Sequence, residues 1–307
     1  MIQKKLVKAI SLTLAGSAFS LAANNSFAAI TMYNTWDAGL APGTYSSTQQ
    51  TTDGWTYTNG KLQSGTLQPW YGTDDYGGAV PFGYTGHAAL NWGVELSGPI
   101  DSATISSAES LKYGGPAADV DTGKGAWLDG QGTLVGDPTK DTGWKHAVDF
   151  GVIKVSENTT ITLTPTTTDG NSANWGISVF DGMDTSSSWS HHGGWHGGYI
   201  PGDTSAANLA KAQTVPSGMV GLSFINFSDG SGLGSNGGNS LTFTALKDHV
   251  YTVVLGGSDR TVNTWSKAQI GYSLNIAAVP EPEEWAMMMF GLPLIGWVAR
   301  RKQKVVA

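Results

Sequence analysis

Apolar side chains recur at every second position in short segments between residues 145 and 279. The pattern is clearest at residues 159–166, where Ile161 and Leu163 alternate with threonines. Clusters of Gly, Asn, Asp and Ser separate the segments and indicate turns. Such alternation is typical of strands with one buried face. We therefore predict seven strands, at residues 149–155, 159–166, 175–179, 220–227, 241–245, 249–255 and 270–276.

Seven strands within about 130 residues favour an all-β fold, an antiparallel β-sandwich or jelly-roll-like domain. The chain has no cysteine, so it depends on its apolar core for stability rather than on disulfides. Nine alternating positions are predicted to be buried, with their threonine and asparagine neighbours facing water. They are Ile161, Leu163, Ile177, Val179, Leu241, Phe243, Tyr272, Leu274 and Ile276.

Residues 29–144 are rich in Gly, Ser, Thr and Asp and give weaker patterns. Whether they form a separate domain or add strands to the sandwich of residues 145–279 stays open. Two short helices are expected, at residues 107–112 and 205–213, each beginning with a serine that can cap it. Strands are expected at residues 30–36, 55–57, 80–84 and 88–96.

The first 28 residues have the three-part layout of a secretory signal peptide. Lys4, Lys5 and Lys8 precede an uncharged apolar run at residues 10–23, and small residues lead up to Ala28. The run is too short for a stable membrane span, which takes about 20 residues. We expect export through the Sec translocon and cleavage by signal peptidase after Ala28.

A second apolar segment lies at the other end of the sequence. Residues 285–299 carry no charge and are followed by Arg300 and Arg301. As a helix they would span about 22 Å, and snorkelling arginines would lengthen that reach toward a hydrocarbon core of about 30 Å. We expect a transmembrane helix at residues 285–299 with its basic end in the cytoplasm.

Residues 280–307 resemble the PEP-CTERM sorting signal of Gram-negative bacteria. The likeness rests on Pro280, Glu281 and Pro282, the short apolar helix, and Arg300 with Arg301. It implies recognition by an exosortase, a membrane-embedded cysteine transpeptidase that would cut near the Pro-Glu-Pro motif. The chain would then be an inner-membrane-anchored precursor that reaches the cell surface or extracellular matrix. Members of the family occur with exopolysaccharide and biofilm systems.

Charge and composition exclude several other classes. The whole chain has 17 basic and 24 acidic residues, and the two end segments hold seven and three of these. The 10 basic and 21 acidic residues that remain make the mature region acidic, so it would repel nucleic acid. Without cysteine the chain is no lipoprotein and has no thiolate metal site.

A histidine-rich segment offers the strongest candidate chemistry. Residues 186–199 read SSSWSHHGGWHGGY and contain His191, His192 and His196, half of the histidines in the chain. Neutral imidazole binds Cu and Zn, and Asp181 and Asp184 just upstream could add oxygen ligands. The spacing fits no structural zinc motif, so a solvated surface loop remains the alternative. His249 is expected to lie outside such a site, whereas a distant histidine such as His87 or His146 could complete it.

Enzymatic motifs are scarce. The sequence has no nucleophile elbow, zinc-protease motif or phosphate-binding loop, and Glu95, Glu109 and Glu157 are the only glutamates before the tail. Several tryptophans could stack on sugar rings, although burial in a core is the more common role for tryptophan. They are Trp55, Trp70, Trp92, Trp127 and Trp144.

These observations favour a non-catalytic, exosortase-sorted protein of the cell surface or matrix, associated with exopolysaccharide or biofilm and without a required cofactor. The alternative is a surface or periplasmic copper- or zinc-binding protein that uses His191, His192 and His196. A second alternative is a carbohydrate-binding or carbohydrate-active protein.

Overall fold

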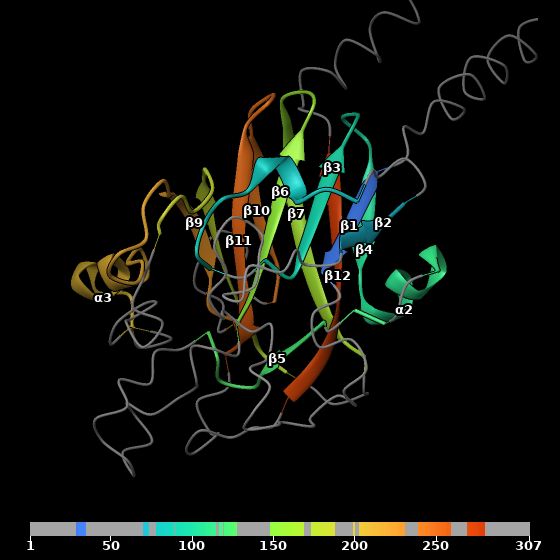
Figure 1. Ribbon diagram of the computed structural model, residues 1–307. Coiled ribbons are helices and arrows are strands. Elements are labelled where there is room, and N and C mark those ends of the chain that lie inside the picture. Colours follow the sequence, from blue (N-terminus) through green and yellow to red (C-terminus); the bar gives the residue numbers. More distant parts are fainter. Residues whose placement is uncertain are drawn as a thin grey trace, which may run out of the picture.

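In a computed structural model, the strands of the protein form two β-sheets (Figure 1). The structure describes residues 29–34, 70–73, 78–88, 90–114, 117–118, 120–127, 148–168, 173–187, 199, 203–230, 239–258 and 269–279. Within these residues the chain is mostly β-structure, as its alternating pattern predicts. The predicted signal peptide with Ala28 and the predicted transmembrane helix at residues 285–299 lie outside the described residues. So do the residues of the predicted sorting motif, Pro280, Glu281, Pro282, Arg300 and Arg301.

The larger sheet has seven strands in the order β2-β1-β3-β6-β11-β8-β9. Its neighbours pair antiparallel except β3 and β6, which run parallel, so the prediction of a wholly antiparallel sandwich is wrong at this pair. A long connection between β3 and β6 is what allows them to pair in this way. The strands are β1 (Ile30–Asn34), β2 (Trp70–Gly72), β3 (Trp92–Leu96), β6 (Asp149–Val155), β8 (Trp175–Asp181), β9 (Ser223–Ser228) and β11 (Val250–Gly257).

The smaller sheet has five strands, four of them in the order β10-β7-β12-β4, with β5 paired to one end of β12. They are β4 (Ser102–Ile105), β5 (Asp121–Gly123), β7 (Thr159–Thr167), β10 (Leu241–Ala245) and β12 (Gln269–Val279). Strands from residues 29–144 therefore enter both sheets, together with strands from residues 145–279.

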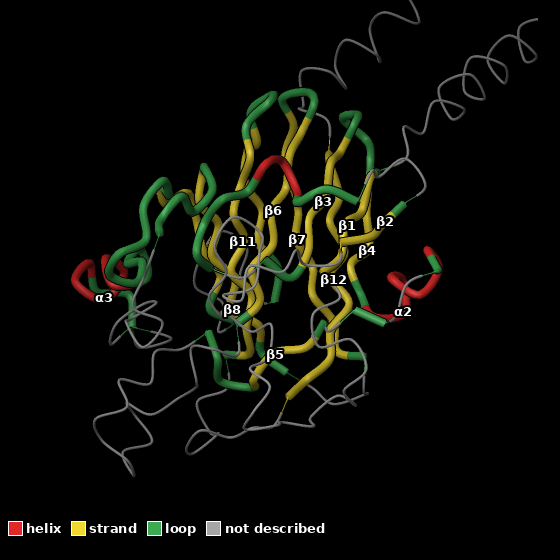
Figure 2. Tube along the Cα trace, in the orientation of Figure 1, coloured by secondary structure: helices red, strands yellow, loops and turns green. Residues whose placement is uncertain are grey.

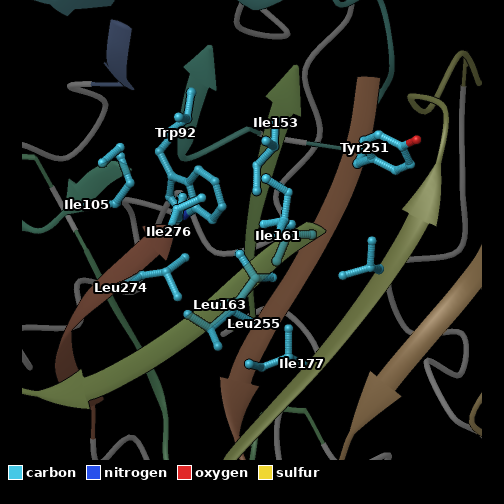
Figure 3. Packing of buried hydrophobic residues seen from close by; sticks show 14 of the residues in the cluster. Trp92, Ile105, Ile153, Ile161, Leu163, Ile177, Tyr251, Leu255, Leu274 and Ile276 are labelled. Atoms are coloured by element: carbon cyan, nitrogen blue, oxygen red, sulfur yellow. The ribbon is translucent and has the colours of Figure 1, made fainter. Parts of the chain in front are cut away.

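The main core lies between the two sheets. Ile161 and Leu163 of β7 and Leu274 and Ile276 of β12 face Ile153 and its neighbours in the larger sheet (Figure 3). All nine positions predicted to be buried are at most 4% exposed, which confirms the register of the alternation. Because a one-residue slip would turn the apolar set to solvent, this core fixes the pairing of β7, β10 and β12.

The seven-stranded sheet is packed on both faces. Phe150, Val152 and Val254 point away from the main core into a second cluster with Tyr84, Met219 and other loop residues. The loops around residues 80–90 and 215–222 supply this cover. A strand buried on both faces reads as a continuous apolar run rather than as an alternation, which accounts for the sequence of β6.

Two buried tryptophans pack on strand glycines. Trp92 lies against Gly151, where an added Cβ would come within 2.2 Å of the indole, and Trp127 lies in the same way against Gly176. Both tryptophans are fully buried, and Trp70 is 7% exposed, so none of the three offers a stacking face for a sugar ring. Trp55 and Trp144 lie outside the described residues.

The two predicted helices are present but short. Ser106 caps α2 (Ser107–Ser110), which continues as η2 (Leu111–Tyr113), and Ser205 caps α3 (Ala206–Lys211). The tube in Figure 2 shows them at opposite sides of the sheets. The predicted strand at residues 80–84 is wrong: Pro81–Gly83 form the short turn η1, and Phe82 within it has a left-handed φ of 52°, which an extended strand does not allow. Among the described residues no helix is long and apolar enough to cross a membrane.

A buried hydrogen-bonded chain joins the sheets. The Trp92 indole N–H donates to the Tyr272 hydroxyl over 2.9 Å, and that hydroxyl donates to Asp149 over 2.5 Å. Trp92 and Asp149 belong to the larger sheet and Tyr272 to the smaller one, so the chain passes through the core from one sheet to the other.

Tyr272→Phe should lower the free energy of unfolding by about 1.5–3 kcal/mol, since it removes a hydroxyl that is bonded to a buried carboxylate. Urea unfolding followed by tryptophan fluorescence measures this change. Tyr113→Phe is the matched control: its hydroxyl makes a 3.4 Å contact with Glu109 outside the buried core, and we expect a change within about 0.5 kcal/mol. Equal losses of unfolding free energy in the two variants would contradict the expectation that the buried Tyr272 hydroxyl stabilises the fold more than the Tyr113 hydroxyl does.

Candidate metal-binding region

Three loops meet where β8 ends and β11 begins. The Gly182 N–H donates to the Val250 carbonyl over 2.8 Å, and the Thr185 N–H donates to the Val220 carbonyl over 3.1 Å. Gly182 has a φ of +98°, and a Cβ there would lie 2.1 Å from the Gly221 carbonyl oxygen. A glycine is therefore needed for the chain to leave β8 in this direction.

The Asp184 carboxylate holds this loop junction together. One oxygen accepts hydrogen bonds from the backbone N–H groups of His87 and Ala88, and both oxygens accept from Ser186. The side chain is 1% exposed. A buried carboxylate needs such donors, since leaving it without them is costly. Asp184, which the sequence suggested as a metal ligand, thus has its acceptor positions occupied by the loops.

Asp181, the last residue of β8, pairs with His249, the residue before β11. The His249 Nδ1 lies 3.1 Å from both carboxylate oxygens. The imidazole stacks on the Tyr251 ring with centroids 6.2 Å apart, and its side chain is 44% exposed. A carboxylate only accepts, so Nδ1 carries the proton and Nε2 of the neutral ring has a lone pair. Metal-binding histidines are oriented by a carboxylate in this way.

His87 lies at the same junction through its backbone bond to Asp184. Burial lowers the pKa of the His87 imidazole, and the nearby Asp184 charge opposes that effect in part. A lowered pKa keeps an imidazole neutral near pH 7, which is the form that binds metals.

The three histidines predicted to bind metal, His191, His192 and His196, lie outside the described residues, as does His146. Among the residues that are described, no three His, Asp or Glu side chains lie close enough together to hold an ion. Ser187, the last described residue before His191, precedes it by four residues in the sequence.

The sequence did not bring Asp181 and His249 together. They are 68 residues apart, and their contact follows from the register of β8 and β11, in which Tyr251 lies opposite Asp181. The sequence suggests Asp181 as a possible oxygen ligand but predicts that His249 lies outside the site. The sequence offers one signal for this contact: an acidic residue lies just after one predicted strand and a histidine begins another.

Asp121 of β5 is a second unusual acid. It is 5% exposed, and burial raises the pKa of its carboxyl to about 6. Such shifts are common at functional sites but also arise where a fold simply buries an acid. Burial is the cause of the shift, so we regard it as a cost of folding.

Comparisons with known proteins give no family assignment. No protein-family description and no curated protein matches the sequence. The chain is similar to the surface-associated copper-binding protein CorA of Methylomicrobium album BG8, with 14% identity, 58% of this chain and 93% of CorA covered, and a TM-score of 0.28. It is also similar to the secreted protein MopE of Methylococcus capsulatus, in which an oxidized tryptophan facilitates copper binding. There the identity is 10%, the coverage 77% of this chain and 97% of MopE, and the TM-score 0.30. Likenesses this distant carry no functional conclusion.

Asp121→Asn should remove a pH dependence of stability. Because the folded pKa is raised, the contribution of Asp121 is complete below its unfolded pKa of about 3.9 and is lost as pH rises through about 6. The loss amounts to about 3 kcal/mol, and the neutral asparagine avoids it. Urea unfolding at pH 4 and pH 7.5 should show the variant gaining on the parent at the higher pH. If the difference in unfolding free energy between variant and parent is the same at both pH values, the raised pKa of Asp121 is contradicted.

Proposed function

We propose that this protein is exported to the cell surface and binds Cu(II) or Zn(II) at the loop junction between β8 and β11. The observation that carries the proposal is the Asp181–His249 pair, in which the carboxylate holds Nδ1 and leaves Nε2 available to a metal ion. The pair stands at the surface, where an ion from solution can reach it.

The histidine-rich segment supplies the remaining ligands in this proposal. The chain from Ser187 to His191 spans at most about 14 Å, because a residue extends the chain by no more than about 3.6 Å. The proposal therefore requires the chain to bring His191 back toward the junction from Ser187, which follows the Ser186 that bonds to Asp184. His192 and His196 follow within five residues of His191. Several imidazoles with carboxylate support favour copper or zinc over calcium or magnesium, which prefer oxygen ligands.

Delivery to the surface is the second part of the proposal and rests on the two ends of the sequence. A signal peptide cleaved after Ala28 would start export, and the PEP-CTERM-like tail from Pro280 would present the precursor to an exosortase in the inner membrane. Metal binding by the domain and sorting by the tail are independent, and each has its own test.

Calorimetry with Cu(II) and Zn(II) tests the metal site. His191→Ala combined with His196→Ala should abolish binding, and His249→Ala or Asp181→Asn should weaken it about tenfold or more. Binding should weaken below about pH 6.5, since protonated imidazole cannot bind a metal.

Asp248→Asn is the control for Asp181→Asn. It removes the same charge from an exposed residue next to His249, and asparagine tolerates the φ of 64° at this position. Metal binding should remain unchanged. Absence of heat with either ion would refute the site as a whole, whereas heat that is lost in the double histidine variant but unaffected by His249→Ala would remove only the Asp181–His249 contribution.

Replacing Pro280, Glu281 and Pro282 together by alanine tests the sorting proposal. Export should continue, but the full-length precursor should accumulate in the inner membrane because the exosortase no longer recognises it. Immunoblots of membrane and surface fractions, with mass spectrometry of the C-terminus, measure this. Efficient processing of the triple variant would contradict the proposal that Pro280, Glu281 and Pro282 are the recognition motif.

A further inference from the structure

Among the described residues, the outward face of strands β10, β7, β12 and β4 carries neither charged side chains nor aromatic rings. Every second residue of β7 and its neighbours points away from the core, and these residues are partly or fully exposed. We call them the threonine face: Ser102 and Thr104 of β4; Thr160, Thr162, Thr164 and Thr166 of β7; Thr242 and Thr244 of β10; and Ser273, Asn275, Ala277 and Val279 of β12. A protein with formal net charge −7 thus has a four-stranded surface on which none of the described residues is ionisable.

Strand register places these residues in rows across the sheet. One row runs Thr242–Thr162–Ala277–Ser102, and the next runs Thr164–Asn275–Thr104. Neighbouring side chains within a row are about 4.8 Å apart, and successive rows are about 6.7 Å apart. The face is therefore a regular array of hydroxyl, amide and methyl groups.

Several of its hydroxyls are available to a ligand. The Thr162 and Thr242 hydroxyls lie 3.1 Å apart and bond to each other. The hydroxyls of Thr160, Thr164 and Thr244 make no hydrogen bond within the described residues. β-Branched side chains are stiff about χ1, so these hydroxyls are already oriented and lose little entropy on binding.

We infer that the threonine face binds a neutral, hydroxyl-rich polysaccharide. An uncharged array cannot select an ionic partner, and the acidic protein repels anionic polymers. Without an aromatic platform each sugar contributes little, so binding requires an extended chain that meets several rows at once. An ice surface shares the hydroxyl chemistry, but strands twist by about 20–25° from one to the next, and a twisted face fits a polymer chain better than a flat crystal. The inference does not depend on the metal site.

Retention of the full-length protein, in mild detergent, on amorphous cellulose tests this inference. The parent should bind, and it should not bind polygalacturonate, an anionic polymer. Combined Thr160→Val, Thr164→Val and Thr244→Val removes the three available hydroxyls, keeps the side-chain shape, and should weaken binding about tenfold or more. Thr204→Val, at an exposed threonine before α3, is the matched control and should bind like the parent.

A second variant guards against a folding defect in the first. Thr244→Lys places a long charged side chain on an exposed edge strand and should also weaken binding, while circular dichroism reports an intact fold. Failure of the parent to bind cellulose, or equal binding by the parent and the triple valine variant, would overturn the inference. Inhibition of ice recrystallisation that the valine variant retains, with no cellulose binding, would overturn it in favour of ice.

Discussion

The hydrogen-bonded chain from Trp92 through Tyr272 to Asp149 is the contact on which the arrangement of the two sheets depends. Apolar packing alone lets sheets slide, because dispersion contacts have little directionality. A buried indole, phenol and carboxylate must instead meet in one geometry, since each would otherwise be buried without its bond. The chain thereby sets β3 and β6 of the larger sheet against β12 of the smaller one. Gly151 makes room for the Trp92 ring beside it, so the absence of a side chain at that position belongs to the same constraint.

The two sheets treat their outer faces in opposite ways. Loops that meet at Asp184 cover the outer face of the seven-stranded sheet, and they bring the Asp181–His249 pair to the surface at their margin. The outer face of the five-stranded sheet instead carries the threonine face. In the two proposals, this rigid scaffold would keep an ion site on its loop-covered side apart from a polymer-binding surface on its plain strand side.

Sequence patterns predicted the elements whose own residues determine them. Alternation along β7, β8, β10 and β12 located nine core positions, and serine caps located α2 and α3. The short strands β2, β4 and β5 were missed, because three or four residues show no period and owe their form to partners far along the chain. At residues 80–84 an alternating pattern belonged to a turn, since Phe82 adopts a left-handed backbone. The Asp181–His249 contact could not be predicted without the register of β8 and β11, which no local pattern encodes.

The position of β12 affects the order in which this chain can fold. β12, the last described strand of the protein, lies in the interior of the smaller sheet between β7 and β4, and it also pairs with β5. Until residues 269–279 are in place, β4 and β5 lack this partner and the Trp92–Tyr272 bond cannot form. A chain threaded through a translocon from its N-terminus would therefore cross as an unfolded polymer and close its sheets only after β12 had emerged. The domain would then complete its fold only as the residues that follow Val279 emerge. A folded domain would therefore form only once translocation has reached residues 280–307.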